Sequence, residues 1–261
     1  MSIVIFDFYK EKLLMKEFDT LIIGCGYASV GYALAKGNCL IVEEGETADT
    51  YFYLPLKDYI AKDYTPVCQE AKQLKCIFEQ MNIYGDGMIN LNKLECAFCE
   101  FISQTNVKIY FRTNVVEIKK QKDGYVATLL TVNGLTDVKA KKILDARATE
   151  QGDTTITLLF ASEQPEQDKL LLEKAFLGAK VQQAFFKDRY ALTIPTTKNY
   201  SKTLVEVLDK WKQVNPTAKI IYFAPKLYVE NQGVCDLYDG RYTCPEQALE
   251  SGISLASKEA R

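Results

Sequence analysis

The stretch FDTLIIGCGYASVGYALAKGNCLIVEEG (residues 18–45) decides the fold. It contains an apolar run, a glycine turn, a helical stretch, and a second apolar run that ends in acidic residues, which is the pattern of a β-α-β unit. Glycines permit a sharp turn and close backbone approach, and the free N–H groups at the start of the following helix attract an anion such as a diphosphate. We therefore expect the diphosphate of a dinucleotide to contact Gly24, Cys25, Gly26, Tyr27, Ala28 and Ser29.

An acidic residue stands where such a unit binds the ribose of its nucleotide. Glu43 ends the second apolar run nineteen residues after Gly24, close to the spacing of about 20 at which a carboxylate reaches the ribose hydroxyls. Glu44 is the adjacent competitor for that role. An acid at this place argues against a 2′-phosphate and hence against NADP. The alternative is that GCGYAS is only a tight strand-to-helix turn in an α/β domain.

Composition narrows the classes of function. The chain has 261 residues, 48% hydrophobic and 25% charged, with 32 basic and 34 acidic side chains. It has no long basic run, so we expect no nucleic acid and no membrane as partner, but a small molecule or a protein. Histidine is absent, which excludes a Ser-His-Asp or Cys-His hydrolase and a His-ligated zinc enzyme. Eight cysteines without an export signal indicate reduced thiols and a cytoplasmic protein.

The remaining chain predicts an α/β fold with a central parallel sheet. Two helices are expected within residues 64–81 and 90–104. Three β-rich runs follow, separated by Asp123-Gly124 and the strong hairpin signal Asn133-Gly134, so that an antiparallel excursion returns to the first sheet. We expect residues 1–153 and 201–261 to form one nucleotide-binding domain and residues 154–200 to form a small strand-rich insert or cap.

Several separated pieces together resemble the FAD-dependent oxidoreductases that have the glutathione-reductase-type FAD-binding domain. They are residues 18–45, NVKIYFRTNVVEI (106–118), VKAKKILDARA (138–148) and LYDGRYTCPEQALESGISLASKE (237–259). The resemblance implies a Rossmann-like domain with FAD as cofactor, its pyrophosphate on the glycine loop and its ribose on Glu43. It also implies adenine contacts from the backbone of Val115, and a contact of Asp239 with the ribityl or pyrophosphate end.

The chain departs from this family at identifiable places. Ala146-Arg147-Ala148 stands where Ala-Thr-Gly is usual, and Tyr238 stands where glycine is expected. Residues 154–200 hold one glycine, Gly178, so a second dinucleotide fold for NAD(P)H is absent. We expect electron or hydride transfer between bound flavin and an unidentified small molecule, with the catalytic residues unknown. The alternatives are a catalytically degenerate flavin-fold scaffold and an NAD-binding enzyme that uses only the first β-α-β unit.

Four cysteines invite a redox or metal interpretation. Cys96 and Cys99 form a CxxC inside a predicted helix, where the spacing places both thiols on one face, and we interpret them as core residues. No second CxxC completes a four-sulfur site, so we expect no metal. Cys235 and Cys244 flank the closing motif and are the better candidates for a redox-active thiol, although ordinary packing is the more common state.

Overall fold

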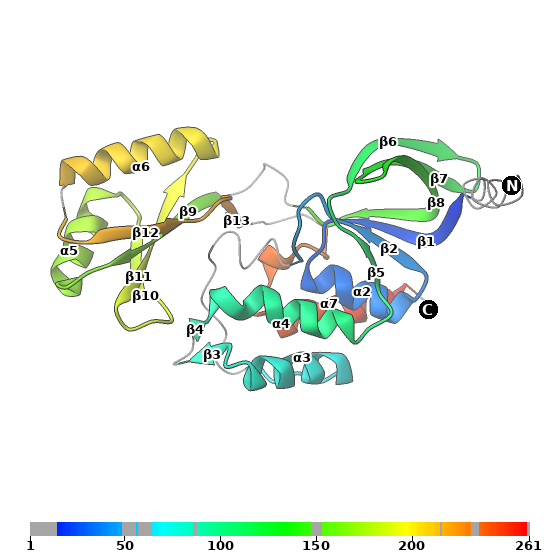
Figure 1. Cartoon of the computed structure of the whole chain (residues 1–261), viewed down its shortest axis with the longest axis horizontal. Coiled ribbons are helices and arrows are strands. Elements are labelled where there is room, and N and C mark those ends of the chain that lie inside the picture. The colour runs from blue at the N-terminus through cyan, green and yellow to red at the C-terminus, as the bar shows by residue number, and fades with distance from the viewer. Residues whose placement is uncertain are drawn as a thin grey trace, which may run out of the picture.

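The computed structural model describes residues 15–48, 56, 64–85, 88–147, 153–214, 216–230 and 235–259. Two large sheets, with a third sheet of only two short strands, organise these residues (Figure 1). Residues 1–14 and, apart from Leu56, residues 49–63 lie outside the described residues. Within the described part, no helix is both long enough and apolar enough to cross a membrane.

The first sheet has six strands in the order β5-β2-β1-β8-β7-β6. Strand β1 pairs in parallel with β2 and with β8, and β2 pairs in parallel with β5. The β6–β7 and β7–β8 pairs are antiparallel. This arrangement confirms the expected α/β fold with an antiparallel excursion that returns to the parallel sheet. The strands are β1 Lys16–Ile23, β2 Cys39–Val42, β5 Lys108–Tyr110, β6 Asn114–Gln121, β7 Gly124–Thr131 and β8 Gly134–Asp145.

Helices α2 (Tyr27–Lys36) and α7 (Pro245–Lys258) lie side by side below this sheet (Figure 1). Their backbones touch at two glycines. A Cβ on Gly31 would lie 2.0 Å from the carbonyl oxygen of Leu249, and a Cβ on Gly252 would lie 2.0 Å from that of Ala28. No other residue type leaves room for this approach, so the two glycines fix how α7 crosses α2.

Two further helices, α3 (Gln69–Gln80) and α4 (Leu91–Ser103), complete this part of the core and are joined by the short β3–β4 hairpin (Tyr84–Gly85 and Met88–Ile89). The interpretation of the CxxC as core was wrong, because Cys96 and Cys99 are exposed. The apolar residues of α4 recur at helical spacing and define the buried face, which leaves both thiols on the solvent side. The buried residues of α4 are Leu91, Leu94, Ala97, Phe98 and Phe101.

The second sheet is antiparallel and is larger than the insert expected from the sequence. Its central strand β9 (Asp153–Ala161) pairs with β11 (Arg189–Thr196), β12 (Lys219–Phe223) and β13 (Tyr228–Glu230), and β10 (Lys180–Gln183) pairs with β11. Strands β12 and β13 therefore belong with this sheet, and not with the first sheet as we expected for residues 201–261. Of the described residues after β13, residues 235–259 return to the first unit, where α7 packs against α2.

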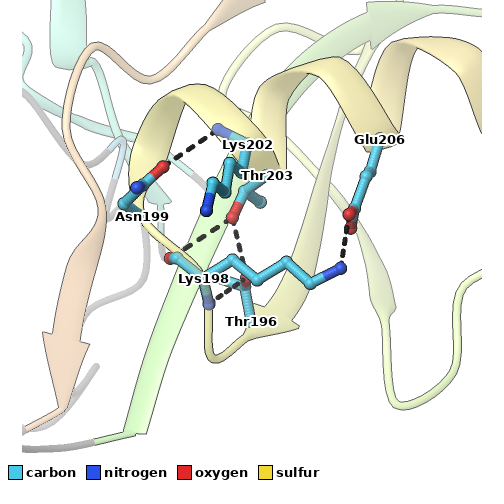
Figure 2. Close-up of polar contacts among 6 residues, drawn as sticks. All are labelled: Thr196, Lys198, Asn199, Lys202, Thr203 and Glu206. Carbon is cyan, nitrogen blue, oxygen red and sulfur yellow. Dashed lines mark hydrogen bonds and ion pairs between the residues drawn. The ribbon is translucent and has the colours of Figure 1, made fainter.

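Helix α6 (Tyr200–Val214) also packs on the second sheet, beside the shorter α5 (Pro165–Ala175) (Figure 1). Its Trp211 meets Phe160 of β9 edge to face, with ring centroids 5.8 Å apart. Figure 2 shows how the helix begins: the Asn199 side chain accepts a bond from Lys202 N (3.1 Å), and the hydroxyls of Thr196 and Thr203 are 2.8 Å apart. These contacts join the end of β11 directly to α6, which explains why the helix stays with the second unit.

Candidate functional site

The glycine loop lies at the carboxyl end of β1, between β2 and β8. Gly24 N donates to Val42 O of β2 (2.8 Å), and Ala146 N, just after β8, donates to Ile23 O (2.8 Å). Gly24 has a φ of +101°, which favours glycine over any other residue. Helix α2 follows at once, with Gly26 in extended conformation as its N-cap. This geometry places the first N–H groups of α2 at the edge of the sheet, as the sequence predicted.

Glu43 faces this loop, whereas Glu44 does not. The Glu43 side chain is only 3% exposed, and its two oxygens accept bonds from Cys25 N (2.8 Å) and Gly45 N (2.9 Å). Glu44 is exposed and forms an ion pair with Lys226 at 3.6 Å. A carboxylate offers about four acceptor positions, so Glu43 keeps acceptor capacity beyond its two loop bonds.

Asp239, which lies far from the glycine loop in the sequence, contacts that loop in the structure. It begins a 3-10 turn (Asp239–Arg241) before α7 and is fully buried. Its carboxylate accepts bonds from Tyr27 N (2.6 Å) and Ala28 N (2.8 Å), the first two amides of α2. A Cβ on Gly26 would lie 2.3 Å from Asp239 Oδ2. The sequence pointed to Asp239, but a direct bond to the start of α2 could not be predicted.

The other loop side chains point into the protein. The Tyr27 ring stacks on Phe98 of α4 with centroids 3.8 Å apart, and Cys25 is fully buried. The Ser29 hydroxyl is buried and has no hydrogen-bond partner in the described part of the chain. These three residues can therefore contribute backbone N–H groups and shape to a ligand, while their side chains belong to the packing around α2.

The segment around Val115 reaches the same edge of the sheet. Thr113 N donates to Glu43 O (2.9 Å), which holds the start of β6 beside the acidic residue. Val115 follows two residues later and is partly buried in the apolar cluster on the face of the first sheet that α2 and α7 do not cover. Asp145, at the end of β8, pairs with Arg147 through two side-chain bonds of 2.9 and 2.7 Å. Arg147 is thus engaged in a local ion pair at the position where the family motif differs.

Another buried carboxyl group, that of Glu246, lies at the start of α7, and it was not singled out as a site residue from the sequence. Glu246 is 3% exposed, and one of its oxygens accepts a bond from the Tyr84 hydroxyl of β3. Its other oxygen, Oε2, has no partner among the described residues. Burial raises the pKa of Glu246, and burial followed by the charge of Glu246 raises the pKa of the Cys244 thiol to about 12. A raised pKa disfavours the reactive thiolate, which supports ordinary packing over the redox-active alternative for Cys244.

Comparisons with known proteins bear on the fold. No protein-family model matches the chain, and no curated protein matches it. A geranylgeranyl bacteriochlorophyll reductase-like protein from Thermoplasma acidophilum aligns with a TM-score of 0.57 at 12% identity, over 95% of this chain and 79% of that one. p-Nitrophenol 4-monooxygenase from Pseudomonas putida aligns at 0.52 and 13%, over 94% and 79%. Aklavinone-11 hydroxylase, solved with FAD and aklavinone, aligns at 0.51 and 13%, over 95% and 63%. The chain shares the fold of these proteins.

The residues present would suit the adenosine end of an FAD molecule better than its pyrophosphate end. At the adenosine end, Glu43 is buried against the loop and has spare acceptor positions for ribose hydroxyls. At the pyrophosphate end, the amides of Tyr27 and Ala28 are already bonded to the Asp239 carboxylate. A phosphate oxygen can use these two donors only when the carboxylate moves away. Glu43 could therefore hold a ribose, whereas an internal carboxylate already occupies the two amides that could hold a phosphate.

Proposed function

We propose that this chain is an FAD-dependent oxidoreductase that transfers electrons or hydride between bound flavin and a small-molecule substrate. The observation that carries the proposal is the buried Glu43 carboxylate against the Gly24–Ser29 loop, within a fold shared with a hydroxylase solved with FAD. When bound, FAD supplies the redox chemistry, and the polypeptide supplies binding and orientation. The glutathione-reductase-type subclass and the cytoplasmic location are parts of the same proposal.

Each residue of the frame has a distinct task in this proposal. The Glu43 carboxylate accepts the ribose hydroxyls through the lone pairs that Cys25 N and Gly45 N leave open. The backbone near Val115 borders the adenine. The amides at the start of α2 bind the diphosphate. We assign the ribose to Glu43 and not to Glu44, because Glu44 is exposed and paired with Lys226.

Equilibrium dialysis against FAD, NAD and NADP tests the proposal. We expect saturable binding of FAD, and a loss of about tenfold or more in affinity for Glu43→Gln, because a hydrogen bond to a charged group contributes about 1.5–3 kcal/mol. Glu44→Gln is the matched control and should bind FAD like the wild type. Thermal melts of both variants separate lost binding from lost folding. Binding of NAD without FAD contradicts the proposal, and binding of neither favours the catalytically degenerate scaffold.

A further inference from the structure

The Asp239 carboxylate lies where the glycine loop would bind a phosphate. It is fully buried, and it accepts the N–H groups of both Tyr27 and Ala28 at 2.6 and 2.8 Å. It also contacts Gly26 so closely that a Cβ there would lie 2.3 Å from Oδ2. The space beside Gly26, where a ligand anion would bind, is therefore occupied by the Asp239 carboxylate of the same chain.

Asp239 and a phosphate cannot share these amides. Each N–H group makes one strong hydrogen bond, and the positive end of the helix dipole acts over only the first turn. A second anion at the same place would also face an uncompensated buried charge. A diphosphate thus gains the donors of Tyr27 and Ala28 only if the carboxylate leaves.

The turn that carries Asp239 is tied to the second sheet by two tyrosines. The Tyr238 hydroxyl donates to Val229 O of β13 (2.7 Å), and the Tyr228 hydroxyl of β13 donates to Gly240 O (2.6 Å). Tyr238 is 2% exposed, and its ring packs against Gly240. These two bonds on either side of Asp239 join its turn to the last strand of the second unit.

The helix that follows is fixed separately. Gly31 and Gly252 bring the backbones of α2 and α7 into direct contact, so α7 has little freedom to shift relative to the loop. A movement that withdraws Asp239 is therefore a movement of the 3-10 turn Asp239–Arg241 relative to α7. That movement has to break the hydroxyl bonds of Tyr228 and Tyr238.

We propose that Asp239 is an internal latch on the cofactor loop: its carboxylate occupies the phosphate position in the free protein, and the Tyr228–Tyr238 pair couples its release to strand β13 of the second sheet. This inference rests on the proposed function, because FAD is the ligand that the latch excludes. It differs from the role implied by the family resemblance, in which Asp239 contacts the cofactor. The two roles predict opposite effects of removing the charge.

The test measures FAD binding by quenching of flavin fluorescence, and pyrophosphate binding by calorimetry. Asp239→Asn leaves a weaker, neutral acceptor at the amides, so we expect FAD affinity to rise about tenfold. The Tyr228→Phe, Tyr238→Phe double variant keeps the rings and loses the bonds, and should also bind FAD more tightly. Tyr222→Phe, at an exposed tyrosine of β12, is the matched control and should leave affinity unchanged.

The outcomes separate the latch from the proposed function. Weaker or unchanged FAD binding by Asp239→Asn, while the wild type binds FAD, overturns the latch and leaves the function standing. If no variant binds FAD, the function is contradicted and pyrophosphate decides the latch: binding by Asp239→Asn and not by the wild type supports it, and binding by neither overturns it. If Asp239→Asn does not fold in a thermal melt, the tyrosine variant gives the same decision.

Discussion

Glu246 and Glu250 lie one turn apart on α7, yet the protein shifts their pKa values in opposite directions. Burial raises the pKa of Glu246 above its ordinary 4.5. Burial also acts on Glu250, but hydrogen bonds from the Tyr64 hydroxyl and from Cys68 N and Val67 N outweigh it and lower the pKa below 4.5. One helix face thus holds a carboxyl that favours its proton and a carboxylate that favours its charge.

These two glutamates should make opposite contributions to stability as pH changes. The folded pKa of Glu246 is raised, so the unfolded chain loses this proton first, and stability falls as pH rises above 4.5. Glu246→Gln removes this loss. The difference in urea midpoint between the variant and the wild type should therefore be more positive at about pH 8 than at about pH 4. Among the described residues, the side chains that act on the pKa of Glu246 are Tyr84, Cys244 and Lys75, and tyrosine, cysteine and lysine ordinarily titrate above this window.

Glu250→Gln should behave in the reverse sense. The folded pKa of Glu250 is lowered, so its stabilising contribution is present above 4.5 and is lost as pH falls through the folded value. The variant should therefore have a lower urea midpoint than the wild type at about pH 8, and the difference should shrink toward about pH 3. A decrease at about pH 8 for both variants would contradict the raised pKa of Glu246.

The contact between α2 and α7 should tolerate no added methyl group. We expect Gly252→Ala to reduce the free energy of unfolding by about 2 kcal/mol or more, because overpacking forces two backbones apart. The added methyl carbon would lie 2.0 Å from the carbonyl oxygen of Ala28. Ser254→Ala, at an exposed position of the same helix, is the control and should change stability by less than about 0.5 kcal/mol. Urea unfolding of the two variants checks this, and equal midpoints would contradict the close crossing.

The eight thiols should divide by exposure when the native protein is treated with iodoacetamide. Cys76, Cys96 and Cys99 are exposed and should react within the first minutes. Cys39 and Cys244 are buried, and burial raises the pKa of the Cys39 thiol to about 11, so both should react only on unfolding. Mass spectrometry of the labelled peptides gives the order. Labelling of Cys244 as fast as Cys96 would contradict the buried position of Cys244 at the start of α7.

Local patterns were sufficient to predict the first β-α-β unit. Residues 18–45 carry their strand, turn and helix signals within a few residues of one another, and Asn133-Gly134 specifies a hairpin by itself. The sequence did not show which of Glu43 and Glu44 faces the glycine loop, because only tertiary packing buries Glu43 and exposes Glu44.

Non-local contacts account for what the sequence missed. The pairing of Ile220 with Phe160 assigns β12 to the second sheet, and it depends on residues sixty positions apart. The bond from Tyr27 N to Asp239 spans 212 positions. The exposure of Cys96 could have been predicted from the sequence, because the apolar spacing of α4 already indicates that the opposite face of the helix is buried.

The central claim is that the chain binds FAD at the Glu43 loop in a redox-active form. The most direct measurement is the visible spectrum of the protein after incubation with excess FAD and gel filtration, for the wild type, Glu43→Gln and Asp239→Asn. We predict that flavin absorbance elutes with the wild type, bleaches with dithionite, decreases for Glu43→Gln and increases for Asp239→Asn. Elution of all flavin with the small molecules, for the wild type and Asp239→Asn alike, would contradict the claim.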